Sequence, residues 1–406
     1  MIPKSVQKNG WKSIPEIEAC IERAIVERVF PGCVVGVVDR SGMRLILPFG
    51  RYTYEHDSSQ VREDTIYDVA SITKSIPVSC LALRLMDEGR LHLDDRLIEY
   101  VPEVNNSDRE ATLIRRLLTH TLHFCFPLSS LKNESPGVII RAIFDTPFRS
   151  RPGAYFSYSN ATSILLGLAI ERLYGKPLDA AAQEQFFHPL DMKRTTFHPL
   201  RRFDRSDIVP TEIDGWRGGV VQGEVHDESS WVLIHRRRGS GRPLERKNQP
   251  VTEGHMPGVK TTLPGVPGAA GLFSTVPDLL RFLHMLLNHG TDRGRRFFAN
   301  ETVRSMHTNQ IREIGECTAL GWELNQRHYM GKYCSEQTFG KTGFTGCMCL
   351  CDMERMIGIV MLSNSTYPMR KPDMEAINGV RRDLADIVFK NMHGIPAGDD
   401  ETPLLR

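Results

Sequence analysis

The sequence predicts a mixed α/β fold of the α+β kind: an antiparallel sheet built from both termini and flanked by helices, with an inserted helical domain. Two observations support this fold class. Short apolar runs typical of strands occur near both ends of the chain, at 33–39 and 44–49 and again at 347–351 and 357–362. The residues between these two groups carry mostly helical patterns, so we expect one sheet closed by both ends of the chain.

Each flanking element has a local signal. Residues 16–29 repeat apolar side chains at the helical period, which predicts an amphipathic helix. Ser41-Gly42 separates the first two strand-like runs and predicts a hairpin turn. Helical patterns return at 276–289 and near 374–391.

A further helix is expected from Ser71 to Glu88, where Gly89 supplies a C-terminal cap. Pro77 should kink this helix or mark an adjustment in its second turn, because proline has no N–H to donate. The middle of the chain continues in helical segments such as LIRRLLTH and SILLGLAIERLYG.

The expected organisation is a single catalytic unit over residues 1–406. Its parts follow the patterns above: a sheet part at about 16–75 and 270–395, a mostly helical part at about 76–234, and a surface-loop insertion at 235–268. The loop is expected because that stretch is rich in glycine, proline and basic residues and has few apolar ones.

Composition argues against several function classes. The chain has 51 basic and 49 acidic residues and a formal net charge of +2, which gives no reason to expect a nucleic acid or an anionic membrane as partner. Apolar runs such as 164–170 fall far short of the roughly 20 residues of a membrane span. The N-terminus lacks a signal-like apolar core and the nine cysteines show no framework spacing, so we expect a cytoplasmic location. The expected partner is a small molecule, and the oligomeric state is left open.

The segment Ser71-Ile72-Thr73-Lys74 places a hydroxyl and an amine three residues apart at a predicted helix start. At that spacing both side chains lie on one face of the first turn. The helix N-terminus favours a developing alkoxide, and a neutral lysine amine can take the serine proton. Ser-x-x-Lys also arises by chance, so further segments decide its meaning.

Two such segments follow. Tyr158-Ser159-Asn160 precedes a helix, and it offers a phenol that can relay a proton and an amide that can hold a substrate carbonyl. Lys341-Thr342-Gly343 precedes a strand-like run, where a glycine on an edge strand would let a substrate backbone approach. The cation of Lys341 would lower the pKa of Lys74 toward that of a usable base.

These three segments, in this order, resemble the signature of the serine β-lactamase and penicillin-binding-protein superfamily. The Tyr-x-Asn form is similar to that of class C β-lactamases, D-Ala-D-Ala carboxypeptidases and β-lactamase-fold esterases. Longer segments, such as RPGAYFSYSNATSILLGLAIERLYGKPL and GLFSTVPDLLRFL, also look like family segments and together cover most of residues 20–365. The resemblance implies a β-lactamase/transpeptidase-like fold.

Carried over residue by residue, the resemblance implies that Ser71 is the acylated nucleophile and that Lys74 and Tyr158 share general-base and proton-relay work. It implies an oxyanion hole made by the backbone N–H groups of Ser71 and Phe344. The residues implied to position the substrate are Asn160, Lys341, Thr342 and Gly343. Relatives follow the LLTHT stretch with Ser-Gly-Leu where this chain has residues 122–124 as Leu-His-Phe, so no one relative supplies the substrate.

Two other histidine signals have simpler interpretations. His226 and Asp227 could serve a different serine triad, but the chain has no Gly-x-Ser-x-Gly elbow, so we expect this pair to support the site or line the pocket wall. His120 and His123 lack nearby carboxylate or cysteine partners and are expected to be ordinary core or surface histidines.

No cofactor or metal is expected. Cys347, Cys349 and Cys351 alternate along a predicted strand and share one face, so we interpret them as small buried apolar residues. Gly340-Lys341-Thr342 mimics the end of a phosphate-binding loop, but Ser335 stands where that motif needs a glycine.

The predicted reaction is acyl transfer to Ser71, followed by deacylation by water or another acceptor. An ester or amide is the first choice of substrate. A β-lactamase or D-amino-acid peptidase is second, because Lys341 favours a substrate carboxylate, and acyl transfer to an alcohol is third. From a different class, the chain could be a catalytically inactive binding protein on the same scaffold, against which the intact motif residues argue.

Overall fold

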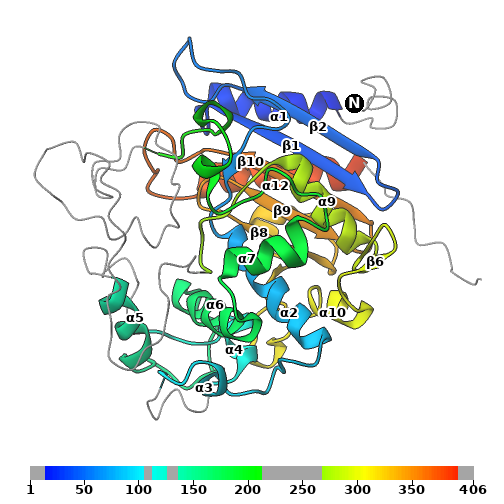
Figure 1. Cartoon of the computed structure of the whole chain (residues 1–406). Coiled ribbons are helices and arrows are strands. Elements are labelled where there is room, and N and C mark those ends of the chain that lie inside the picture. The colour runs from blue at the N-terminus through cyan, green and yellow to red at the C-terminus, as the bar shows by residue number, and fades with distance from the viewer. Residues whose placement is uncertain (1–13, 105–111, 126–135, 213–267, 392–406) are drawn as a thin grey trace, which may run out of the picture.

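The structure is a computed structural model, and the residues it describes are 14–104, 112–125, 136–212 and 268–391. Among them, a six-stranded antiparallel sheet has the order β2-β1-β10-β9-β8-β7 (Figure 1). β1 (Gly32–Asp39) pairs directly with β10 (Ile357–Ser363). Both ends of the chain therefore close one sheet, and the predicted fold class is confirmed.

The sequence predicts only part of the rest of the sheet. β2 (Arg44–Gly50) and β9 (Met348–Asp352) match expected runs. β8 (Thr338–Thr342) and the two-residue β7 (Glu323–Leu324) have no expected counterpart. The remaining short strands are β3 (Tyr67–Asp68), β4 (Phe273–Ser274), β5 (Thr291–Asp292) and β6 (Arg295–Arg296).

Both faces of the sheet are buried, because alternate side chains of a strand point to opposite faces. On β1, Val34 and Val38 belong to one apolar core, and Val35 and Val37 belong to the other. Cys349 and Cys351 on β9, and Cys347 directly before it, lie in the first core and are all buried. The prediction that they share one buried face is confirmed.

Helices cover the two faces. α9 (Val276–Leu287) packs against β1, β9 and β10 on one face, where a Cβ at Gly36 would come within 2.3 Å of Val276. α1 (Ile14–Val26) and α12 (Glu375–Asn391) contribute to the other core and contact each other. The chain forms helix here because apolar residues recur on one side of each segment.

A mostly helical part lies below the sheet in Figure 1. Its elements are α2 (Cys80–Asp87), α3 (Leu97–Tyr100), α4 (Ile114–Leu118), α5 (Pro136–Asp145), α6 (Asn160–Tyr174) and α7 (Leu178–Ala182). Short helical turns are η3 (Gln183–Phe187), η4 (Pro199–Arg201), η5 (Arg205–Asp207) and η6 (Arg312–Ile314), and two short helices are α10 (Asn300–Ser305) and α11 (Arg327–Met330). The expected loop at 235–268 lies outside the described residues, except for Gly268.

The expected adjustment at Pro77 is confirmed. The helical segment from Ser71 to Glu88 is interrupted, because Ile76 adopts extended angles (φ −113°, ψ 112°) immediately before Pro77. The π-helical turn η1 (Lys74–Ser79) spans the break, and α2 continues beyond it. The residue before a proline avoids helical angles, which is the physical reason for the interruption.

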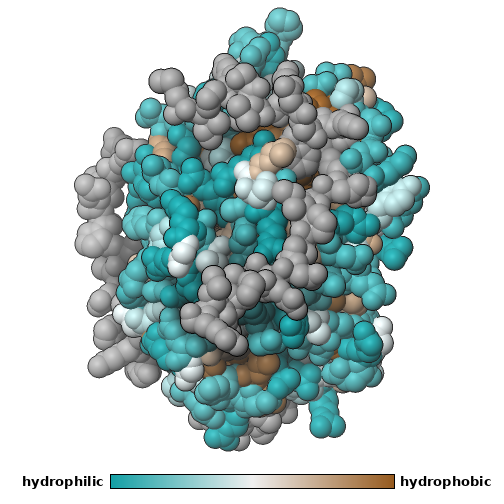
Figure 2. All heavy atoms as spheres, turned by 90° about the vertical axis from the view of Figure 1, so that its right-hand side faces the viewer, coloured by the Kyte–Doolittle hydropathy of each residue, from teal (hydrophilic) through white to brown (hydrophobic). Residues whose placement is uncertain are grey.

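The face of the molecule in Figure 2 is predominantly hydrophilic where residues are described, and its apolar patches are small and separated. Scattered patches of this size are normal on a folded chain. No helix within the described ranges is long and apolar enough to cross a membrane.

Candidate active site

Ser71 follows a constrained segment at the end of β3. The carboxylate of Asp68 accepts the N–H of Ala70 at 2.8 Å, and Ala70 has a φ of 47°, a left-handed conformation that alanine rarely adopts. Ile72 and Thr73 are already helical. Ser71 is therefore presented on a sharp turn immediately before a helix, and strained positions of this kind cluster at functional sites.

Lys74 lies one turn after Ser71 and points at it. The Lys74 N–H donates to the Ser71 carbonyl at 3.1 Å, which fixes the turn. The Lys74 ammonium donates to Ser71 Oγ at 3.0 Å and to the carbonyl of Ala269. The expected common face of serine and lysine is present, and Lys74 is only 3% exposed.

Tyr158 brings the second motif to the same place. It precedes α6, whose N-cap is the Ser159 side chain. The Nζ atoms of Lys74 and Lys341 lie 5.3 Å and 4.4 Å from the centroid of the Tyr158 ring. One residue from each of the three motifs thus meets around one phenol.

Lys341 is held by a carboxylate that the sequence analysis did not single out. Glu323 on β7 forms a buried ion pair and hydrogen bond with the Lys341 ammonium. The second carboxylate oxygen of Glu323 accepts the Tyr329 hydroxyl at 2.6 Å. Glu323 is brought there by pairing of β7 with β8, in which Glu323 lies opposite Gly340.

The pKa values of the two lysines shift in opposite directions. Burial lowers the pKa of Lys74, and the nearby Lys341 cation adds to that effect. Burial also acts against the charge of Lys341, but Glu323 and Tyr158 outweigh it and raise the pKa of Lys341. For Tyr158 burial opposes ionisation, yet the cations of Lys341 and Lys74 prevail and lower the pKa of its phenol. Either Lys74 or Tyr158 can then act as the base.

The turn at 343–347 rests on the segment that carries Ser71. Gly343 N–H donates to the Cys347 carbonyl at 2.8 Å, and Thr345 Oγ1 donates to the Asp68 carbonyl at 2.8 Å. A Cβ at Gly343 would lie 2.4 Å from the carbonyl oxygen of Val69, so only glycine allows this close approach. Gly343 lies just after β8 and not within the strand, and β7 pairs only with Phe339 and Gly340 of β8.

Arg381 of α12 is hydrogen-bonded to the backbone of this turn. Its buried guanidinium donates to the carbonyls of Gly343 and Cys347 at 2.6 Å and 3.0 Å. The backbone N–H groups of Ser71 and Phe344 have no hydrogen-bond acceptor among the described residues. Both groups remain available to a substrate oxygen near Ser71.

The other expected site residues fall in different places. Thr342 ends β8 and is half-buried. Asn160 is the exposed first residue of α6, two residues after Tyr158. His226 and Asp227 lie outside the described residues.

His120 is a residue that the sequence analysis assigned no role. Its ring centroid lies 4.9 Å from that of Tyr158, and its Nδ1 is hydrogen-bonded to Thr162 Oγ1 at 2.8 Å. Burial, with added repulsion from Lys341 and Lys74, holds the pKa of His120 well below its usual value. The left-handed backbone at His120 (φ 51°) turns the ring into this position, and spacing in the sequence gives no signal of it.

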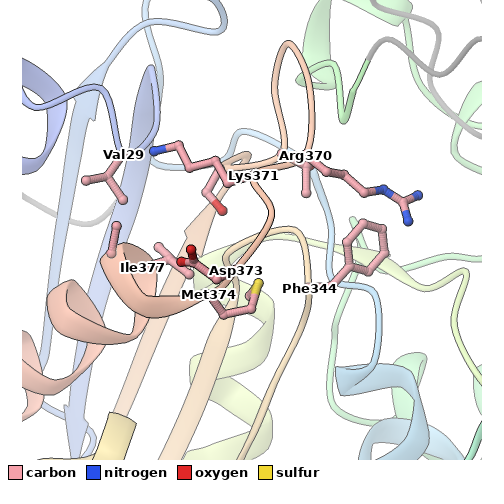
Figure 3. Close-up of a pocket in the computed structure, with 10 residues that line it drawn as sticks. Val29, Phe344, Arg370, Lys371, Asp373, Met374 and Ile377 are labelled. Atoms are coloured by element: carbon pink, nitrogen blue, oxygen red, sulfur yellow. The ribbon is translucent and has the colours of Figure 1, made fainter.

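A cavity of about 190 Å³ adjoins the 343–347 turn (Figure 3). Its lining includes Phe344, Arg370 and Met374, and the Arg370 guanidinium lies 4.8 Å from the centroid of the Phe344 ring. Arg370 also forms two hydrogen bonds of 2.7 Å with the Glu212 carboxylate. None of the motif side chains at Ser71 lines this cavity.

Comparisons with known proteins identify the family and the fold. A family model described as Beta-lactamase matches residues 17–381. An Escherichia coli K12 protein named "Putative D-alanyl-D-alanine carboxypeptidase" is 30% identical over 345 residues, which are 76% of this chain and 72% of that protein. A Bacillus subtilis N-acetylmuramyl-L-alanine amidase is 26% identical over 402 residues, with 89% and 83% of the two chains covered. The solved structure of EstCE1, described as a hydrolase with promiscuous acyltransferase activity, is 17% identical with a TM-score of 0.69 and covers 93% of this chain and 98% of its own.

Proposed function

The chain belongs to the beta-lactamase family of serine hydrolases, and from this premise we propose that it hydrolyses a small ester or amide through an acyl-enzyme on Ser71. The proposal rests on one observation: Ser71, Lys74, Tyr158 and Lys341 converge on one point of the structure. A chance Ser-x-x-Lys has no reason to collect a phenol and a second lysine. The intact set of groups also argues against an inactive binding protein.

In the acylation step, Ser71 Oγ attacks the substrate carbonyl carbon while its proton passes to Lys74 or Tyr158. The N–H groups of Ser71 and Phe344 stabilise the negative oxygen of the tetrahedral intermediate. The carbonyl–leaving-group bond then breaks, and the leaving oxygen or nitrogen takes the proton from the same base. Water repeats the sequence on the acyl-enzyme, which releases a carboxylic acid and restores Ser71.

Lys74 and Tyr158 are suited to this proton transfer. A base must be unprotonated near neutral pH, and an ordinary lysine has a pKa of about 10.4. Burial and Lys341 lower the pKa of Lys74, and the two lysines lower the pKa of Tyr158. The two groups titrate together, so the proton is shared by a coupled pair.

The test is active-site labelling. A fluorophosphonate probe transfers its phosphonyl group to an activated serine and releases fluoride, and tandem mass spectrometry locates the adduct. We expect labelling at Ser71, none in Ser71→Ala, and full labelling in Ser59→Ala, which removes an exposed serine. A label on another residue, or 4-nitrophenyl butyrate turnover that survives in Ser71→Ala, would contradict the proposal.

One relative supports a second candidate, a D-amino-acid peptidase or β-lactamase, because it is named a putative D-alanyl-D-alanine carboxypeptidase. The name of the N-acetylmuramyl-L-alanine amidase supports an amide substrate. Acyl transfer to an alcohol uses the same acyl-enzyme, with an alcohol in place of water, and EstCE1 is described as having a promiscuous acyltransferase activity. The cytoplasmic location stays a prediction.

A further inference from the structure

Glu323 gives the site a property that the three motifs do not contain. We propose that Glu323 is a specificity-determining residue that withdraws Lys341 from substrate carboxylates, so that the site favours acyl donors without a negative charge. The inference rests on the proposed function and narrows its substrate class. It is based on the ion pair between Glu323 and Lys341 and on the exposed fractions of these two side chains.

The Lys341 ammonium is paired with a carboxylate of the chain itself. It forms the ion pair with Glu323 and faces the Tyr158 ring at 4.4 Å. The side chain of Lys341 is 3% exposed, whereas that of Glu323 is 22% exposed. Of the two side chains, the acidic one is therefore the more exposed to solvent. Like charges repel most strongly where water is partly excluded.

The Glu323 carboxylate is fixed and does not swing away easily. One oxygen contacts Lys341 and the other accepts the hydroxyl of the buried Tyr329 at 2.6 Å. Lys341 and the Tyr329 hydroxyl together keep the pKa of Glu323 below its usual value despite burial, so its charge persists at neutral pH. Displacing it would leave a partly buried charge without its partner, which is costly.

Arg370 is a second cation beside the 343–347 turn that a carboxylate holds. Arg370, whose guanidinium stacks on Phe344, is held by the Glu212 carboxylate through two hydrogen bonds. Glu212 is 2% exposed and thus permanently placed against this arginine. Two cations that border the turn are therefore each neutralised by a carboxylate of the chain itself.

A matched pair of substrates tests the inference. 4-Nitrophenyl hydrogen adipate carries a free carboxylate, and its methyl ester is the same acyl donor without the charge. We expect the wild-type protein to favour the methyl ester. In Glu323→Gln the ratio of kcat/KM for the anionic over the neutral ester should rise by about tenfold or more, because Lys341 becomes free to bind the carboxylate.

Three further variants define the cause. Glu323→Asp keeps the charge, so the ratio of kcat/KM for the anionic over the neutral ester should stay at the wild-type value. Glu323→Ala removes the charge and should raise this ratio, as Glu323→Gln does. It also provides the test if Glu323→Gln does not fold. The double variant Glu323→Gln with Lys341→Ala should lose the gain, because the freed ammonium is then absent. A merely structural role of Glu323 would change both rates together and leave the ratio unmoved.

The outcomes separate this inference from the proposed function. Turnover of the neutral ester with an unchanged ratio in Glu323→Gln and Glu323→Ala would overturn the inference alone. A wild-type preference for the anionic ester would also overturn it. If no activated ester acylates Ser71, the proposed function fails and the inference fails with it.

Discussion

Lys74 and Lys341 are two buried lysines that face the same phenol from two regions of the molecule, η1 and β8. Both are 3% exposed, and their Nζ atoms lie 5.3 Å and 4.4 Å from the Tyr158 ring centroid. Their pKa values nevertheless move in opposite directions, down for Lys74 and up for Lys341. Lys74 donates to a hydroxyl and a carbonyl, whereas Lys341 contacts the carboxylate of Glu323.

The comparison shows that burial alone does not decide the charge of a lysine. Desolvation disfavours both ammonium groups, and a carboxylate next to one of them reverses the result. The same type of side chain thus has a lowered pKa in one region, which suits the proposed base, and a raised pKa in the other. The cation in turn lowers the pKa of Tyr158 and of Lys74.

Arginine substitutions test this division most strongly. Because arginine stays charged and cannot accept the serine proton, Lys74→Arg should lower the acylation rate by about 10³-fold or more. Lys341→Arg keeps a cation beside Glu323, so the acylation rate on a neutral ester should stay within about tenfold of wild type. Rapid-mixing kinetics with a 4-nitrophenyl ester measure both rates. Equal losses of acylation rate in Lys74→Arg and Lys341→Arg would contradict the proposed difference between the two lysines.

Tyr158→Phe removes the hydroxyl that both lysines face and keeps the ring. Loss of a proton relay should lower kcat by about 10²-fold, with a small change in KM. Tyr155→Phe is the matched control, since Tyr155 is 62% exposed and lies in the same segment. A Tyr158→Phe variant with wild-type kcat would show that Lys74 acts without the phenol.

His120 should have the smallest effect, because it acts through Tyr158. His120→Gln should lower acylation a few-fold, as expected for a contact that orients a reacting group. Its depressed native pKa also makes folding pH-dependent: below about pH 6.5 the unfolded chain binds a proton that folded His120 refuses, so stability falls as the pH falls. Denaturant unfolding at several pH values measures this effect. The free energy of unfolding should decrease less on acidification in His120→Gln than in His123→Gln.

The sequence predicts the parts of the site that lie close together in the chain. Ser71 and Lys74 follow from their spacing, and the sheet follows from apolar runs at both ends. Glu323 gives no such signal, because pairing of β7 with β8 and the hydroxyl of Tyr329 bring it to Lys341. Ring contacts such as that of His120 depend on backbone conformation, which residue patterns do not encode.

Backbone detail is predictable where its cause is local. Pro77 predicts an adjustment in the segment from Ser71 to Glu88, and the break lies at Ile76 directly before it. The close approach of Gly343 to the Val69 carbonyl joins residues far apart in the chain, and no local pattern indicates it. Local signals predict elements, and long-range contacts decide how the elements meet.

The central claim is that neighbouring charges set the protonation of the base, and the pH dependence of acylation on a neutral ester tests it most directly. The charged groups around Tyr158 are Lys74, Lys341 and Glu323, and His120 beside it is held neutral. The rate should fall on the acid side as the base takes a proton.

Removing the Lys341 cation makes protonation of the base easier, so Lys341→Ala should move the acid limb to higher pH. Removing the Glu323 anion makes protonation harder, so Glu323→Gln should move the limb to lower pH. The account predicts opposite shifts in the two variants, measured as the acylation rate against pH beside wild type. An acid limb that stays in place in both variants, or moves the same way in both, would contradict it.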